Sequence, residues 1–252
     1  MSDQEQPIDE QSESKALNVV RWLTEKAIVG IPPLTSAESL AQEYLIDKGY
    51  PDDSARIDSL INWETTKNFT SGFLTGLGGI LTLPIAIPAA MGASWIVQAR
   101  LAATIAKISG YDILCDRVQT FVIATLVGDA LKDIVKNAGI QISRGLAQGL
   151  LKQIPGKVLI QINKQVGFRL LTKAGSTGAI NLVKFIPFVG GAVGGTIDAY
   201  ACRVVGRTAK DIFYQASGEK EDDVIVLTAE PGAKGQTINI DAKPSDGDAQ
   251  AK

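Results

Sequence analysis

Residues 69–99 read FTSGFLTGLGGILTLPIAIPAAMGASWIVQA and contain no charged side chain. The segment is longer than the ~20 apolar residues that a membrane-spanning helix needs. Two prolines, Pro84 and Pro88, interrupt it, and glycines recur along it. Small residues let helix backbones approach closely, and proline breaks a helix. We therefore predict two closely packed helical segments that meet at a proline corner. The pattern leaves open whether this corner packs inside protein or lies in lipid.

A partial repeat of this segment occurs near the end of the chain. Ile-Pro occurs at 87–88 and again at 186–187, and a small-residue helix pattern follows each time. The first pattern continues to Arg100 and the second to Arg203. The repeat predicts two proline-kinked, glycine-rich core helical segments packed against each other. Chance similarity between Ala- and Gly-rich segments is the alternative.

Helical periodicity continues through most of the remaining chain, and strand patterns are absent from residues 15–217. We predict an all-α fold with one compact multi-helix domain over 15–217, in which one helix runs from Asp116 to about Asn137. The acidic N-terminal segment 1–14 is typical of a disordered tail, and the Gly- and Pro-containing segment 218–252 is typical of a disordered or loosely attached one.

The charge distribution indicates an anionic partner. The net charge is −2, yet every charged residue between Asp133 and Asp198 is basic. Residues 140–174 place apolar side chains on one helical side and basic ones on the other, as membrane-surface helices do and as core-facing helices also do. We predict contact with an anionic membrane surface through Arg144, Lys152, Lys157, Lys164 and Lys173. A protein partner and a merely solvated basic face are the alternatives, and no specific nucleic acid is indicated.

The residue inventory removes several classes of catalyst. The chain has no histidine and two cysteines, so imidazole bases, His-ligated metals and four-cysteine centres are not available. The glycine clusters match neither a phosphate loop nor a dinucleotide fingerprint. We therefore expect no cofactor, no metal site and no enzyme, although chemistry based on carboxylates alone stays open. The acidic N-terminus lacks the pattern of a secretory signal, so we expect a cytoplasmic location or the cytoplasmic side of a membrane.

A few polar residues fall on apolar helical stripes. Asp198, Asp129 and Gln98 each share a stripe with apolar neighbours. A buried carboxylate needs a partner, and Arg169 lies on the stripe of Val158, Ile162 and Val166. We therefore predict a buried polar cluster of Gln98, Asp129, Arg169 and Asp198 that fixes helix packing. A catalytic or transport role for it is the alternative.

Four motifs in order carry a resemblance to a known family. They are LTGLGGILTLPIAIPAAMGASWIVQARLAATIAKISGYD, LVGDALKD, QIPGKVLIQINKQVGFRLLTKAG and KFIPFVGGAVGGTIDAYACRVVGRTAKDIF. Over residues 60–215 the chain resembles the EcsC family of bacteria, named after a protein encoded beside an ABC transporter. The family has no established biochemical activity. The resemblance implies interest, without assigned roles, in Gln98, Arg100, Asp129, Gly167, Asp198 and Arg203.

Two functions follow as expectations. The first is a non-enzymatic, membrane-associated helical protein that is an accessory to transport or cell-envelope homeostasis. The second is a soluble cytoplasmic helical bundle that binds a small molecule or a partner protein.

Overall fold

The computed structural model describes residues 10–69, 87, 89–140, 151–180 and 189–214, and in these ranges the fold is all-α, as predicted. The described part contains an isolated bridge between Ile31 and Leu34 and no strand. Its elements are α1 (Glu10–Val29), α2 (Ala37–Ile46), α3 (Asp53–Phe69), α5 (Ala89–Ile108), α6 (Asp116–Ala124), the 3₁₀ turn η1 (Thr125–Val127), α7 (Ala130–Asn137), α9 (Gly156–Ile180) and α10 (Val189–Phe213).

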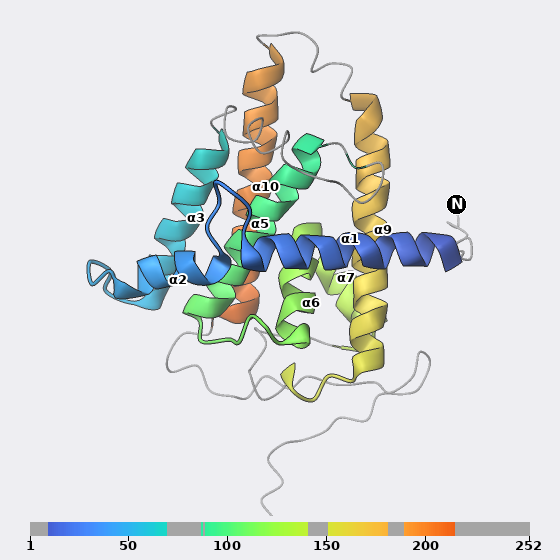
Figure 1. Ribbon diagram of the computed structural model, residues 1–252, viewed down its shortest axis with the longest axis horizontal. Coiled ribbons are helices and arrows are strands. Elements are labelled where there is room, and N and C mark those ends of the chain that lie inside the picture. The colour runs from blue at the N-terminus through green and yellow to red at the C-terminus, as the bar shows by residue number, and fades with distance from the viewer. Residues whose placement is uncertain (1–9, 70–86, 88, 141–150, 181–188, 215–252) are drawn as a thin grey trace, which may run out of the picture.

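Helix α5 is the centre of the bundle. Every residue from Gly92 to Ala106 is buried, because α1, α2, α3, α6 and α10 all pack against this helix (Figure 1). Apolar and small residues occur around the whole circumference of this helix, and such a helix is stable only when other elements surround it. The last part of the charge-free segment, residues 92–99, is therefore internal to the protein. Residues 70–86 and 88, with Pro84 and Pro88, lie outside the described ranges.

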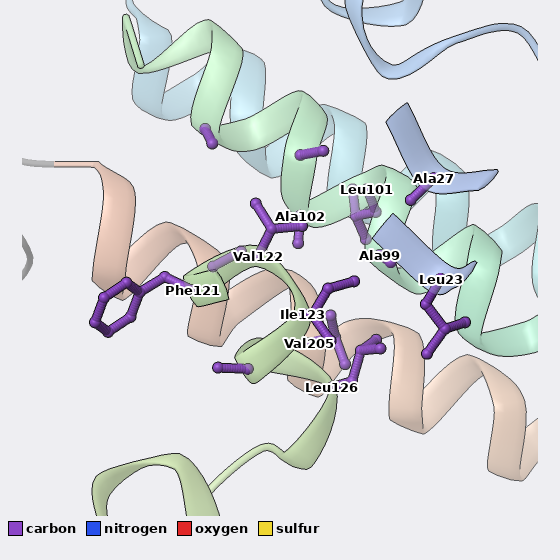
Figure 2. Packing of buried hydrophobic residues seen from close by; sticks show 14 of the residues in the cluster. Leu23, Ala27, Ala99, Leu101, Ala102, Phe121, Val122, Ile123, Leu126 and Val205 are labelled. Atoms are coloured by element: carbon purple, nitrogen blue, oxygen red, sulfur yellow. The ribbon is translucent and has the colours of Figure 1, made fainter. Parts of the chain in front are cut away.

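The core is continuous from α1 to α10. Figure 2 shows Leu23 and Ala27 of α1 near Ala99 and Leu101 of α5, with α6 and Val205 of α10 on another side. The two helices of the partial repeat, α5 and α10, pack directly on each other. A Cβ added to Gly206 of α10 would lie 2.8 Å from Cγ1 of Ile61 of α3 and 3.2 Å from Cδ2 of Leu101 of α5, so the absent side chain permits the close approach of these helices.

Helix α1 crosses α9 at another close contact. A Cβ added to Gly167 of α9 would lie 2.3 Å from the carbonyl oxygen of Ala16, well inside van der Waals contact. The backbone of α1 therefore rests directly on α9 at this glycine. Figure 1 shows α1 running across α9, with its N-terminal turns extending past it.

Two boundaries differ from the prediction. The helix predicted from Asp116 to about Asn137 is divided, because Gly128 takes a φ of 58° that ends η1 before α7 starts. Helix α1 begins at Glu10, inside the segment 1–14 predicted to be disordered. Its first turn carries Glu10 and Glu13, and acidic side chains stabilise a helix N-terminus. Residues 1–9 and 215–252 lie outside the described ranges, as does Pro187.

Membrane crossing is not supported by any helix in the described ranges. None of them is both long enough and apolar enough to span a bilayer.

Candidate functional sites: the exposed face of α9 and the buried polar residues of α5

Helix α9 has one apolar side buried in the bundle and one side in solvent. Ile162, Val166 and Leu170 are buried, as the periodicity predicts. The opposite side carries residues three and four positions apart, which lie on one helical stripe. We call this stripe the α9 face, and its members are Lys157, Ile160, Lys164, Phe168 and Thr172.

The α9 face combines basic and large apolar side chains. Ile160 is 52% exposed and Phe168 is 42% exposed, although both are hydrophobic. Lys157 is exposed at one end of the face, and α9 contains no acidic residue. Alternating apolar and cationic side chains on one helix surface are typical of helices that lie on anionic membranes.

The other predicted basic residues lie at different positions relative to this face, and Lys173 is on the helical side of Ile162 and Val166, opposite it. Lys152 is exposed just before α9 begins, and Lys173 is exposed in its C-terminal half. Lys164 differs from them, since its Nζ lies 2.5 Å from Oε2 of Glu13 on α1. Arg144 falls in residues 141–150, outside the described ranges.

Part of the predicted polar cluster forms between α5 and α10. Nε2 of the buried Gln98 donates a hydrogen bond to Oγ of Ser94 at 2.9 Å. This hydroxyl donates in turn to Oδ1 of Asp198 at 3.3 Å. Gln98 and Asp198 are therefore joined through Ser94. The relay lies between the two helices of the partial repeat.

Of the predicted cluster Gln98 is buried, Asp198 is partly buried, and the other two members are exposed. Asp129 is exposed, because η1 and Gly128 interrupt the stripe that Val122 and Leu126 begin, and Asp129 instead precedes α7. Arg169 is also exposed. Its position at the edge of the buried stripe leaves its side chain in solvent, although the neighbouring Leu170 is buried. The prediction that Arg169 neutralises a buried carboxylate is therefore wrong.

Sequence reasoning missed the buried ionic pair of the bundle. Glu64 of α3 is 2% exposed and Arg100 of α5 is 4% exposed. Arg100 Nη1 lies 3.8 Å from Oε2 of Glu64, and Nη2 donates a hydrogen bond to Oγ1 of Thr35 at 3.1 Å. Lys67, at the rim, approaches the other carboxylate oxygen of Glu64 at 2.7 Å. The missed signal is that Glu64 continues the apolar stripe of Ile57, Leu60 and Ile61.

Burial changes the titration of three groups. The desolvation of the Arg100 guanidinium lowers its pKa, and the nearby carboxylates of Glu64 and Glu43 partly oppose this change. Desolvation raises the pKa of Tyr44 to about 12, with smaller contributions from Tyr50, Glu64 and Glu43. Burial alone raises the pKa of Tyr111 to about 12.

The described ranges contain no group of three or more Cys, Asp and Glu residues that could hold a metal ion. Comparison of the chain with protein-family models, curated proteins and solved structures gives no match. The resemblance to the EcsC family therefore stays a prediction from the four motifs.

Proposed function

We propose that this protein binds an anionic membrane surface peripherally through the α9 face. There it would act as a non-enzymatic accessory to transport or cell-envelope homeostasis, in keeping with the resemblance to the EcsC family. The observation that carries the proposal is the exposure of Ile160 and Phe168 between basic residues on a helix that has no acidic side chain.

The energetics of this face favour peripheral binding. A basic side chain near an anionic bilayer surface contributes about 1 kcal/mol, and Lys157 on the α9 face and Lys152 just before α9 are both exposed to make this contact. Insertion of Ile160 and Phe168 at the headgroup boundary removes their apolar area from water, at about 25 cal/mol per Å². Charge attracts the helix to the surface, and apolar burial then retains it.

The arrangement of helix ends gives further support. Figure 1 shows the C-terminal ends of α3 and α9 and the N-terminal ends of α5 and α10 at one end of the bundle. These four ends flank residues 70–88 and 181–188, which contain one charged residue, Lys184. Two mostly apolar segments of the sequence therefore join helices whose ends lie at the same end of the bundle.

Vesicle flotation tests the proposal. The full chain should float with phosphatidylserine–phosphatidylcholine vesicles at low salt, less so at high salt, and not with phosphatidylcholine alone. Lys152→Gln with Lys157→Gln should lower the partition coefficient about tenfold to thirtyfold. Arg203→Gln with Arg207→Gln makes the same change in charge on exposed residues of α10, so it should have little effect.

A second pair of variants tests the apolar contribution. Ile160→Ser should weaken binding, whereas Ile46→Ser should not, because Ile46 is exposed at the end of α2, across the molecule from α9 (Figure 1). A full chain that stays unbound to anionic vesicles at low salt contradicts the proposal. That result would favour the alternative, a soluble bundle that binds a protein or small molecule, for which the exposed Trp63 of α3 is a candidate contact.

A further inference from the structure

We infer that the acidic first turn of α1 is an intramolecular competitor for the α9 face and lowers its affinity for anionic membranes. The inference rests on the proposed function and adds its regulation. The decisive contact is the ion pair between Glu13 of α1 and Lys164 of α9, in which Nζ and Oε2 lie 2.5 Å apart.

The position of Lys164 makes this contact relevant. Lys164 lies four residues after Ile160 and four before Phe168, so it is at the centre of the α9 face. Glu13 therefore places a negative charge at the centre of a surface that is otherwise basic and apolar. Its carboxylate both neutralises Lys164 and repels an approaching anionic bilayer.

The backbone geometry holds Glu13 in place. Ala16 contacts Gly167 directly, and Glu13 and Lys164 each lie three residues before these contact points on their own helices. The ion pair is thus one helical turn from the closest approach of the two backbones. Glu10, in the same first turn of α1, adds a second negative charge next to Glu13 along the helix.

The ion pair is weak enough to be exchanged. The side chains of Lys164 and Glu13 are 35% and 37% exposed, and solvent-accessible pairs of this kind contribute little to stability. A bilayer with many anionic headgroups offers Lys164 a comparable or better partner. Membrane binding would then replace the Glu13 carboxylate by a lipid phosphate or carboxylate, without any rearrangement of the core.

Two single variants of the full chain test the inference. Glu13→Gln should raise the partition coefficient on phosphatidylserine–phosphatidylcholine vesicles about five-fold, because it restores one basic side chain to the face. Glu10→Gln is the matched control: it makes the same charge change in the same helical turn, on an exposed side chain. It should produce a clearly smaller increase.

A double-mutant cycle keeps the test independent of small effects on folding. In the wild-type chain Lys164→Gln should weaken vesicle binding less than Lys157→Gln, because Lys164 is already paired with Glu13. In the Glu13→Gln background the two lysine substitutions should weaken binding equally. Circular dichroism confirms that each variant is folded.

The outcomes separate the two claims. If the wild-type chain binds but Glu13→Gln binds no better than Glu10→Gln, the competitor role of α1 is wrong and the proposed function is kept. If neither the wild-type chain nor Glu13→Gln binds anionic vesicles at low salt, both claims are overturned.

Discussion

Arg100 of α5 and Glu64 of α3 form an ion pair inside the bundle, with Nη1 and Oε2 3.8 Å apart and both side chains almost fully buried. In the described part of the chain, Arg100 donates a hydrogen bond to the hydroxyl of Thr35, and its Nε atom has no hydrogen-bond partner. A buried guanidinium needs a nearby anion, since desolvation of a charge is costly. Glu64 therefore allows the central helix of the fold to contain a cation.

Glu64→Gln should lower the free energy of unfolding by about 3 kcal/mol, because it preserves the volume of the side chain but leaves the buried Arg100 charge without its carboxylate. Chemical denaturation measures the change. The double variant Glu64→Leu with Arg100→Met should be more stable than Glu64→Gln, because it removes both charges.

Asp58→Asn is the control for this experiment. The pair of Asp58 with Lys210 is shorter, at 2.7 Å, but Asp58 is largely exposed. Loss of this ion pair should lower the free energy of unfolding by less than about 1 kcal/mol, because solvent screens the two charges. If the two substitutions have equal effects, burial does not determine the importance of the Glu64–Arg100 pair.

Gly167→Ala should destabilise the protein by about 1 to 3 kcal/mol, although alanine is the better helix former. The new Cβ would lie 2.3 Å from the carbonyl oxygen of Ala16, so α1 has to move away from α9. Thermal unfolding provides the measurement. Gly156→Ala, where nothing lies within 4 Å of the added Cβ, should be neutral or slightly stabilising. An equally stable Gly167→Ala variant would show that the crossing of α1 and α9 adapts freely.

Much of the helical arrangement follows from periodicity within single helices. The stripe of Ile162, Val166 and Leu170 was predicted to be apolar and is buried. The helical character of Ala89–Ile108 was likewise predicted from its small and apolar residues. Both inferences succeed because a helical stripe depends only on residues a few positions apart.

Predictions about which helix packs on a given side of another helix were less successful. Arg169 lies on the predicted stripe but is exposed beside the buried Leu170, and the stripe alone does not determine which of its edge positions other helices cover. Asp129 was predicted to be buried but is exposed, because Gly128, which has a positive φ, ends the preceding turn. The pairing of Glu64 with Arg100 joins two helices whose relative orientation is set by tertiary packing. Of the predicted cluster, Gln98 and Asp198 are brought together, with Ser94 as the unpredicted link.

Tyr111 should make stability fall at alkaline pH. Burial raises its pKa from 10.0 to about 12, and its ring contacts Phe213 edge to face at a centroid distance of 5.3 Å. Between these two values the folded state keeps a phenol proton that the unfolded state has lost. The free energy of unfolding therefore decreases as pH rises through this window, and the stabilisation is complete only below about pH 10.

Tyr111→Phe isolates this contribution, since Tyr44 contributes in the same direction and the lowered pKa of Arg100 in the opposite one. Phenylalanine keeps the ring against Phe213 and removes the titrating group. The variant should lose less stability than the wild-type chain between about pH 10 and about pH 12, as measured by urea unfolding at closely spaced pH values. Between about pH 7 and about pH 9 the two profiles should run parallel, because the phenol is protonated in both states there. Parallel profiles over the whole alkaline range would mean that Tyr111 titrates alike in the folded and unfolded chain.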